Sequence, residues 1–433
     1  MQHYFDFAGH RTSYRQELLA GVATFLAMAY IIVVNPAILA GAGIPRDASV
    51  TATILTAAFG TLVMALYARR PFAIAPYMGE NAFIVFTIVK GMGFAWQTAL
   101  GAIFCSGVLF TVLTLLGVRG WIANAIPASL KHSFAVGIGL FLMFIGLNDM
   151  GLIALGVPGA PVALGNLAKP TALLAIGGFL LTAWLLARGT HGALLIGMLV
   201  TTLGSFALGV IPLPTQIVSL PPSLGPIALQ LDLRGALTVD ALPVVVIIFV
   251  MAFVDTIGTV LGLSAKAGLL DANGNLPQIE RPMLADALVN LVGPALGTTT
   301  SGAFIESAVG IAEGGRTGFT ALVVAGLFLL SLCFAPLLTA IPPHAYGIAL
   351  FAIGILMVRP VTQLDFDDMT ELVPAIVTIA LISFSYNIGV GMTAGLLVYP
   401  ALKLLTGRAR EVPAPLWVLT ALSALFYAVY PYR

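Results

Sequence analysis

The chain contains uncharged stretches that are too long and too apolar for the surface of a water-soluble protein. No Asp, Glu, Lys or Arg occurs from Thr98 to Val118, from Gly192 to Leu231, from Gly318 to Val358 or from Leu372 to Leu402. A helix needs about 20 apolar residues to cross the hydrocarbon core of a bilayer, so several of these stretches hold two spans. Charged residues make up 9% of the chain, against about 25% in soluble domains. The sequence therefore predicts an all-α polytopic membrane protein.

We expect about fourteen transmembrane segments. They are placed at 17–40, 48–68, 74–90, 95–118, 131–148, 170–187, 191–210, 241–264, 282–297, 300–314, 317–340, 344–358, 370–385 and 387–406. A last apolar stretch, 413–431, is either a further span or a helix at the membrane interface. With the N-terminus in the cytoplasm, fourteen Lys and Arg residues fall on the cytoplasmic side and four fall outside. Such an asymmetry is typical of correctly oriented spans, and a bacterial inner membrane is the expected location.

The two halves of the chain carry faint echoes of each other. Met28-Ala29-Tyr30 in the first span is similar to Met251-Ala252-Phe253 in the eighth, and Ala82-Phe83-Ile84 is repeated as Ala303-Phe304-Ile305. With seven spans in each half, the second half enters the membrane from the opposite side. The sequence therefore predicts a 7+7 inverted repeat, a common plan of secondary transporters.

Two of the expected spans are interrupted. Pro71–Asn81 holds two prolines and a glycine before a helix that begins near Gly79, and Gly297–Ser307 holds a Thr/Ser cluster that favours extended backbone. Irregular backbone at membrane depth is tolerated only where it is buried or lines a cavity. We therefore expect the N-termini of two half-helices, with their free N–H groups, to face one central cavity.

Carboxyl groups at membrane depth mark this cavity as the candidate site, because they are costly in a bilayer and usually functional. Asp255 and Glu306 are the main candidates. For Glu80, a functional role and a role as a helix cap are equally compatible with the sequence. Asp286 near a span start is interpreted as structural. A buried carboxyl group can take up and release a proton near neutral pH, so Glu306, Asp255 and Glu80 are the candidates for proton coupling.

A cavity of this kind suits a flat, polar, heteroaromatic ligand. Carboxylates accept hydrogen bonds from ring N–H groups, and Phe83, Phe304 or Phe253 could stack on the ring. The expected substrate-binding residues are Asn81, Asp255, Glu306, Phe83, Ala303 and Phe304. Two alternatives stay open: Asn81 could be a buried residue that fixes the fold, and the phenylalanines could be packing residues.

Four motifs follow one another in an order that is found in a known family. They are Tyr14–Gly21 running on to Met28–Ile31, then Ala75–Phe83, Phe253–Thr259 and Thr300–Gly310. With Gly347–Leu350 and Leu372–Ala375 they resemble the AzgA-like branch of the nucleobase–ascorbate transporters over nearly the whole chain. Many members of that family have a hydrophobic residue at the position of Glu80 and Gly at that of Tyr77, which leaves the preferred base open.

The resemblance implies a fold, an activity and a set of ligands. Spans 1–4 and 8–11 (15–118 and 241–340) would form a core domain. Spans 5–7 and 12–14 with the C-terminal apolar segment (119–210 and 341–433) would form a gate domain, and 211–240 an external loop. The implied substrates are adenine, guanine and hypoxanthine, carried with a proton by an elevator-like movement, often in a homodimer. The implied binding positions are Asn81, Asp255 and Glu306.

Two other function classes were weighed against this reading. An anion transporter for sulfate or bicarbonate could share the architecture, because helix N-termini attract anions, but two carboxylates at the same place would repel them. An intramembrane enzyme would need a catalytic constellation that only Asp255 and Glu306 approach, so no enzyme is expected. No cofactor, metal site or nucleic-acid partner is expected either, since the histidines lack ligand spacing and the net charge is only +1.

Overall fold

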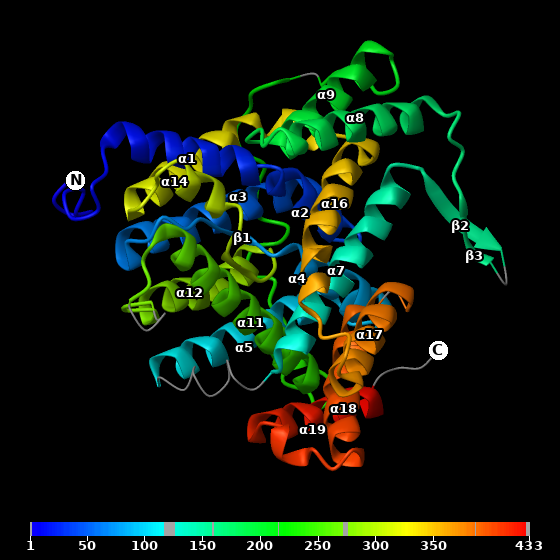
Figure 1. Ribbon diagram of the computed structural model, residues 1–433. Coiled ribbons are helices and arrows are strands. Elements are labelled where there is room, and N and C mark those ends of the chain that lie inside the picture. Colours follow the sequence, from blue (N-terminus) through cyan, green and yellow to red (C-terminus); the bar gives the residue numbers. More distant parts are fainter. Residues whose placement is uncertain are drawn as a thin grey trace.

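The chain folds into two groups of packed helices (Figure 1). The computed structural model describes residues 2–116, 126–157, 160–214, 216–271, 276–385 and 387–429. The first group holds α1 (Tyr14–Met28), α2 (Ile31–Ala40), α3 (Arg46–Val63), α5 (Trp96–Leu115), α11 (Leu242–Ala267), α12 (Glu280–Leu296) and α14 (Gly318–Ser331). The second holds α7 (Ala128–Asp149), α8 (Pro170–Ala187), α9 (Ala193–Ala207), α16 (Pro343–Val358), α17 (Met369–Phe384), α18 (Ile388–Leu405) and α19 (Ala414–Val429).

These groups coincide with the helices expected in the core and gate domains, but their division into a moving and a fixed domain stays a prediction. The expected boundary at 118/119 and the end of the stretch 413–431 lie outside the described residues. The remaining short elements are η1 (Met64–Ala68), α10 (Leu233–Ala236), η3 (Leu332–Phe334), α15 (Ala335–Thr339), η4 (Arg359–Gln363) and η5 (Ala409–Glu411).

Within the described residues, nine helical stretches are long and apolar enough to cross a bilayer by themselves. They are Tyr14–Ala40, Arg46–Ala68, Trp96–Leu115, Ala128–Asp149, Pro170–Ala187, Leu242–Ala267, Gly318–Thr339, Pro343–Gln363 and Ile388–Leu405. Three shorter apolar helices, Ala193–Ala207, Met369–Phe384 and Ala414–Ala428, also match expected segments. The total of fourteen spans stays a prediction.

The first expected span, 17–40, is two helices rather than one. Helix α1 ends at Met28 and α2 begins at Ile31. Between them the carbonyls of Ala29 and Tyr30 accept from Ile32 and Val33, three residues further on. This tighter turn replaces the α-helical pattern and places Tyr30 at the break.

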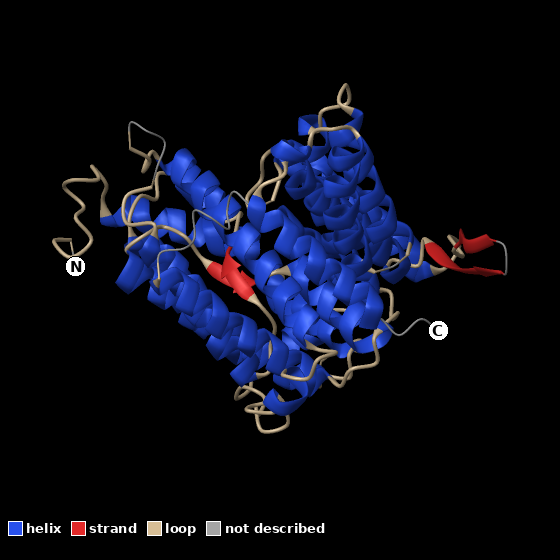
Figure 2. Cartoon of the chain, turned by 90° about the horizontal axis from the view of Figure 1, so that it is seen from below, coloured by secondary structure: helices blue, strands red, loops and turns tan. Residues whose placement is uncertain are grey.

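The two interrupted spans have the predicted form. In one, β1 (Ile74–Pro76) leads into α4 (Met78–Ala82), which continues as η2 (Phe83–Gly91); in the other, β4 (Ser301–Ala303) leads into α13 (Ser307–Ala312). Strand β1 packs on α3, β4 on α12, α4 on α2, and α13 on α1 and α11, so these elements belong to the first group. The strands pair antiparallel, with Ala75 opposite Gly302, at the centre of the molecule (Figure 2). The pairing satisfies backbone groups that would otherwise be unpaired within the membrane.

One line of reasoning for the inverted repeat fails in the structure. Ala82 ends helix α4, whereas Ala303 ends strand β4, so the similar tripeptides Ala82-Phe83-Ile84 and Ala303-Phe304-Ile305 do not occupy equivalent places. The correspondence instead lies in the elements, because each half supplies a short strand followed by a half-helix.

A hairpin outside the helical groups was not anticipated. Strands β2 (Ile153–Val157) and β3 (Ala160–Leu164) pair antiparallel and project from the end of α7 (Figures 1 and 2). In the sequence this segment lies between the expected spans 131–148 and 170–187.

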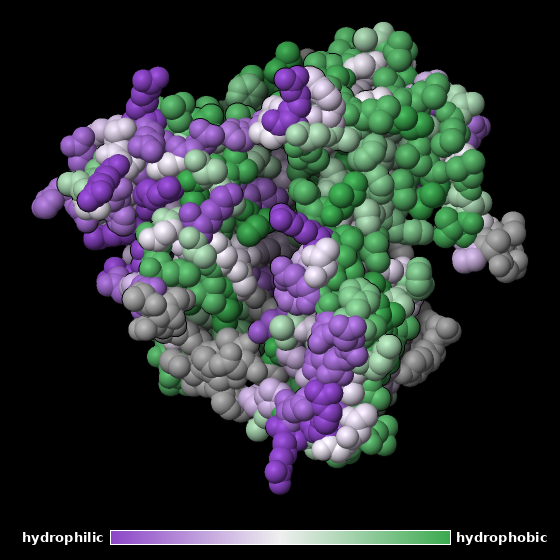
Figure 3. Space-filling model, viewed as in Figure 1, coloured by the Kyte–Doolittle hydropathy of each residue, from purple (hydrophilic) through white to green (hydrophobic). Residues whose placement is uncertain are grey.

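The surface is apolar where the second group faces outward (Figure 3). Leu173, Leu180 and Trp184 on α8 and Leu203 on α9 are exposed. Large contiguous apolar patches are rare on the surface of soluble monomers, whereas the hydrocarbon core of a bilayer solvates them. The surface is hollowed between the two groups, with polar residues along the hollow.

A cluster of ion pairs joins the ends of α17 and α18. Lys403 is fully buried and lies 2.8 Å from both Glu371 and Glu411, while Arg408 lies 2.8 Å from Asp368 and 2.7 Å from Glu411. Hydrogen bonds from Arg408 and Lys403 lower the pKa of the Glu411 carboxyl to about 2. Because this folded-state pKa is depressed, its contribution to stability is present above the carboxyl's ordinary range and is lost as the pH falls towards 2.

Glu17 joins α1 to the start of α14. Its buried carboxylate accepts from the N–H of Arg316 and from both the N–H and the hydroxyl of Thr317 and Thr320. An acid at a helix N-terminus also compensates the helix dipole. Glu17 is therefore one anchor of the first helical group.

We expect Glu17→Ala to lower the free energy of unfolding by more than about 2 kcal/mol, because it leaves several buried donors without an acceptor. Thermal unfolding of the detergent-purified protein measures the effect. The matched control is Glu313→Ala, which removes a side chain that is 45% exposed. Equal melting temperatures for Glu17→Ala and the wild type would show that this contact contributes nothing.

Candidate functional site

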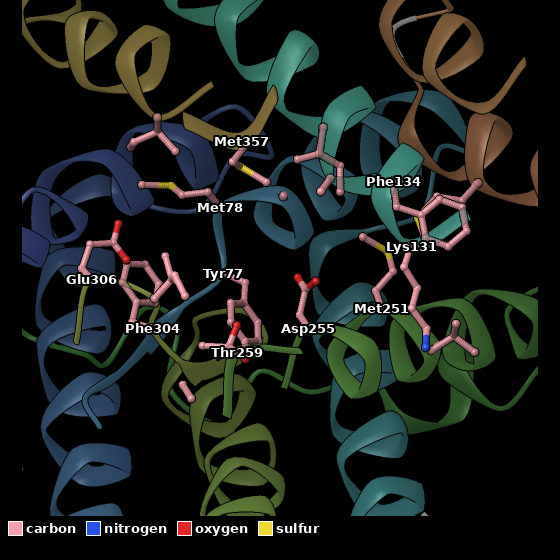
Figure 4. Close-up of a pocket in the computed structure, with 18 of the residues that line it drawn as sticks. Tyr77, Met78, Lys131, Phe134, Met251, Asp255, Thr259, Phe304, Glu306 and Met357 are labelled. Atoms are coloured by element: carbon pink, nitrogen blue, oxygen red, sulfur yellow. The ribbon is translucent and has the colours of Figure 1, made fainter. Parts of the chain in front are cut away.

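A cavity of about 200 Å³ lies between the two helical groups. Pockets for drug-sized ligands run to roughly 300–1,000 Å³, so this one suits a smaller molecule. Its lining residues are Tyr30, Tyr77, Met78, Gly79, Lys131, Phe134, Ala135, Ile138, Val250, Met251, Asp255, Thr259, Ala303, Phe304, Ile305, Glu306, Ile353, Met357 and Met392. The first group supplies the carboxyl groups, and the second supplies mostly apolar walls (Figure 4).

Asp255 and Glu306 both line the cavity, as the sequence analysis expected for them. Asp255 comes from the middle of α11 and is surrounded by protein, yet its side chain remains accessible through the cavity. Glu306 occupies the N-cap position of α13. Figure 4 shows the two carboxyl groups on either side of Tyr77.

The Glu306 carboxyl is oriented by a residue that is distant in sequence. The Tyr30 hydroxyl donates to Glu306 Oε1 at 2.5 Å, a length typical of a charge-assisted bond. Tyr30 is itself 1% exposed and stands at the break between α1 and α2. With Oε1 engaged, Oε2 is the oxygen that the contact leaves available to a ligand.

Ala303 and Phe304 also line the cavity, at the end of β4. The Phe304 ring packs against the Tyr30 ring, with 6.5 Å between centroids and 44° between planes. The backbone N–H of Phe304 donates to Ala73 O, so the strand pairing fixes the ring's position. An aromatic face is thus held beside the Glu306 carboxyl.

Asn81 and Phe83, two of the expected binding residues, do not line this cavity. Met78 and Gly79 in the first turn of α4 reach the cavity, whereas Asn81 and Phe83 come about one helical turn later and contact other elements. Asn81 is fully buried and donates to Asn35 Oδ1 while it accepts from the Thr299 hydroxyl. Phe83 is fully buried and packs near Gly389 of α18.

The Asn81 contacts belong to a polar network beneath the site. Asn35 donates to Thr53 at 2.7 Å and to Thr298 at 2.9 Å, so the network joins α2, α3, α4 and the segment before β4. In this structure Asn81 therefore makes contacts that stabilise the fold, which is the alternative role left open for it by the sequence. A direct substrate contact by Asn81 stays a prediction that needs the side chain to turn.

Glu80 and Asp286 lie behind the cavity wall. Glu80 is 1% exposed and does not line the cavity. Asp286 Oδ2 accepts from the N–H of Ala303 at 3.0 Å, which agrees with its structural interpretation. Asn290, which sequence reasoning missed, donates to Ser301 O and accepts from Ser301 N, and thereby fixes β4 on α12.

The sequence predicted free N–H groups at the start of the half-helix α13, but in the structure these groups are already hydrogen-bonded. Those of Ser307, Ala308 and Val309 donate to the carbonyls of Phe304, Ile305 and Glu306 within the same turn. The α13 end therefore presents the Glu306 carboxyl, rather than a row of N–H donors.

Tyr30 and Lys131 are cavity residues that the sequence did not reveal. Tyr30 occurs in the faint repeat and in the family motif Met28–Ile31, but neither gave it a role, because its partner lies 276 positions away. Lys131 had been assigned to the cytoplasmic end of a span; the structure places it on the cavity wall from α7, the one basic residue among the described residues that line it. Figure 4 shows both Lys131 and Phe134 on the side of α7.

The two helical groups approach closely at Gly79. A Cβ at this position would lie 2.8 Å from the Ile138 side chain of α7, so a larger residue would require that side chain or the helices to shift. A larger crevice of about 1,410 Å³ lies between the same groups, lined by the second half of α7 from Leu140 to Asp149 and by Phe86 and Lys90 of η2. The cavity and this crevice therefore follow one interface between the groups.

Comparison with known proteins identifies the family. The sequence pattern of the permease family matches residues 15–397. The chain is 48% identical to a putative permease of Methanocaldococcus jannaschii over 98% of this chain and 97% of that protein. The chain belongs to the permease family.

Two further relatives of this permease have names that state a substrate. It is 38% identical to the adenine permease AdeP of Escherichia coli, over 99% of this chain and 96% of that protein. It is 39% identical to the guanine/hypoxanthine permease PbuG of Bacillus subtilis, over 99% of both chains. The resemblance to AzgA-like nucleobase–ascorbate transporters is confirmed, and the family consists of transporters rather than enzymes.

The fold of the permease is that of known membrane transporters. The transmembrane domain of a cyanobacterial bicarbonate transporter, BicA, superposes with a TM-score of 0.67 and 17% identity, over 88% of this chain and 97% of that one. The predicted all-α polytopic membrane fold is confirmed, and the permease is an integral membrane protein. At this identity the likeness concerns the fold alone.

We expect the Tyr30–Glu306 contact to show as an energetic coupling of about 1–3 kcal/mol in a double-mutant cycle. The cycle uses Tyr30→Phe, Glu306→Ala and the double variant, and it measures the free energy of unfolding in detergent. Each single change leaves the other partner's polar atom unpaired, so the double change should cost less than the sum.

The control cycle combines Tyr30→Phe with Thr259→Ala, a cavity residue of α11 for which additive effects are expected. If the Tyr30→Phe and Glu306→Ala effects were also additive, the hydroxyl would not hold the carboxyl.

Proposed function

We propose that this permease carries purine nucleobases into the cell together with a proton. The observation that carries the proposal is a pair of carboxyl groups, Asp255 and Glu306, facing one small cavity beside an aromatic ring. The names of relatives matched over nearly the whole chain support adenine, guanine or hypoxanthine as the cargo.

The cavity offers what a purine needs for recognition. Carboxylates accept hydrogen bonds from ring N–H and exocyclic amino groups, and the face of Phe304 can stack on the ring. Met78, Met251 and Met357 add polarizable, adaptable walls around a flat ligand. A small cavity with few polar groups among apolar ones is the usual form of a site for a small molecule.

The same carboxyl groups provide a basis for proton coupling. A carboxyl that binds a proton changes from an acceptor into a donor, so its protonation state decides which edge of a base it can bind. Asp255 and Glu306 stand where a base and a proton would meet, and Tyr30 restricts Glu306 to one available oxygen. Uptake would then follow the proton gradient.

An elevator-like movement is supported by how the cavity is built. The candidate ligands Asp255, Phe304 and Glu306 all belong to the first group, whereas α7, α16 and α18 of the second group supply Phe134, Met357 and Met392. The first group could therefore carry the whole polar site along a largely apolar wall. A homodimer, a cytoplasmic N-terminus and a bacterial inner membrane complete the proposal as predictions from the sequence.

An anion carrier on the same fold is the competing proposal, since a bicarbonate transporter shares it. Lys131 is a cation on the wall, but two acids, Asp255 and Glu306, line the same cavity. A carboxylate facing an anion in a low-dielectric cavity is repulsive, so purine transport accounts better for the residues present.

We expect Glu306→Gln to reduce uptake of labelled adenine, guanine or hypoxanthine about 10–100-fold while the protein remains folded, because a charged hydrogen bond is lost. Asp255→Asn should act in the same way. Uptake into reconstituted vesicles, with and without an imposed pH gradient, is the measurement, and uracil is tested beside the three purines.

Glu313→Gln is the matched control, because it makes the same chemical change at a half-exposed site outside the cavity. Normal purine uptake by Glu306→Gln would exclude Glu306 from the site. Failure of the wild type to accumulate or bind any of the four bases, with uptake of bicarbonate or sulfate instead, would overturn the purine proposal in favour of the anion carrier.

A further inference from the structure

Glu80 is a buried carboxyl group with no hydrogen-bond partner. It lies in the first turn of α4 with 1% of its surface exposed, and neither Oε1 nor Oε2 has a hydrogen bond. An unsatisfied buried polar group is rare, because its lost hydration is not compensated, and the cost is greater when the group is charged. The position is therefore costly unless the carboxyl has a use.

The groups that face Glu80 are acidic or neutral. Asp255 of α11 and Asp286 of α12 interact with it electrostatically, and the Thr300 hydroxyl is the neutral polar group that acts on it. Tyr77, at the start of α4, interacts with all three acids. Among the described residues, no basic side chain acts on Glu80; Lys131 of α7 lines the cavity instead.

Other oxygen atoms in this cluster are also unpaired. Thr300 Oγ1 and Asp286 Oδ1 have no hydrogen bond, although Asp286 Oδ2 is engaged by the Ala303 N–H. The described residues contain no group of three His, Cys, Asp or Glu side chains arranged to hold a metal ion. A small species that satisfies a lone carboxylate without a coordination shell is a proton.

The cluster is separate from the purine site but in contact with it. Asp255 lines the cavity and is accessible there, while Glu80 lies behind the wall that Tyr77 and Gly79 form. Asp255 is thus the group that both lines the cavity and interacts electrostatically with Glu80. All of these residues belong to the first helical group and would move with the purine.

We propose that Glu80 is the site that carries the co-transported proton, and that Asp255 passes this proton between the cavity water and Glu80. The proton moves from hydronium to the Asp255 carboxylate and from there to the Glu80 carboxylate, and no other bond changes. This inference rests on the proposed purine transport and deepens it.

The test compares driven uptake with exchange in Glu80→Gln, which keeps the size of the side chain but cannot bind the proton. In the wild type, one co-transported proton supports about tenfold accumulation for each pH unit imposed. Glu80→Gln should lose this accumulation and only equalise the purine concentration across the vesicle. Its exchange of labelled for unlabelled purine should remain close to the wild-type rate, because the purine ligands are intact.

Glu80→Leu is the second variant, and it covers the case in which Glu80→Gln does not assemble. It replaces an unpaired carboxyl by an apolar group, so its melting temperature should equal or exceed that of the wild type. It should show the same loss of accumulation with retained exchange. The control Glu313→Gln should keep both activities.

Gradient-driven accumulation by Glu80→Gln or Glu80→Leu at the wild-type level would overturn the inference. Loss of both exchange and accumulation in a folded variant would also overturn it, since Glu80 would then serve purine binding or the movement itself. So would wild-type accumulation that follows a sodium gradient and ignores pH. Absence of purine uptake by the wild type would instead contradict the proposed function, and this inference with it.

Discussion

The structure depends on how two interrupted spans satisfy their backbone at membrane depth. A helix that stops in the middle of a bilayer leaves N–H and C=O groups that water cannot reach. Here β1 and β4 pair with each other, the Tyr77 N–H donates to Thr300 O, and Asn290 bonds both backbone groups of Ser301. The chain can therefore leave the helical conformation without a large cost, and the freed length forms the wall of a cavity.

The carboxyl groups take their places from this arrangement. Glu306 caps α13 directly after β4, and Asp255 reaches the same cavity from the continuous helix α11. The hydroxyl of Tyr30 fixes Glu306 from a third element. Three segments that are far apart in the sequence thus build one site, and all of them belong to the same helical group.

The sequence predicted the class of fold and the interrupted spans because these follow from local chemistry. Uncharged stretches, the prolines before Gly79 and the Thr/Ser cluster before Glu306 are visible without any knowledge of contacts. The sequence also singled out Asp255 and Glu306, since an acid at membrane depth is conspicuous, and both line the cavity. The sequence did not show which residues of the interrupted span reach the cavity. Met78 and Gly79 in the first turn of α4 do so, whereas Asn81 and Phe83, about one turn later, contact Asn35 and Gly389 instead. The sequence did not predict that Tyr30 and Lys131 line the cavity. Tyr30 is positioned there by its contact with Glu306 of another segment, and Lys131 by the packing of α7 against the first group.

The most direct test of this account is an experimental structure of the permease with a bound purine, such as adenine or hypoxanthine. We expect the ring to lie between β4 and α11, against Phe304, with the carboxyl groups of Asp255 and Glu306 within hydrogen-bond distance of its edge. A purine bound elsewhere, for instance in the crevice beside Phe86 and Lys90, with Asp255 and Glu306 away from it, would contradict the account.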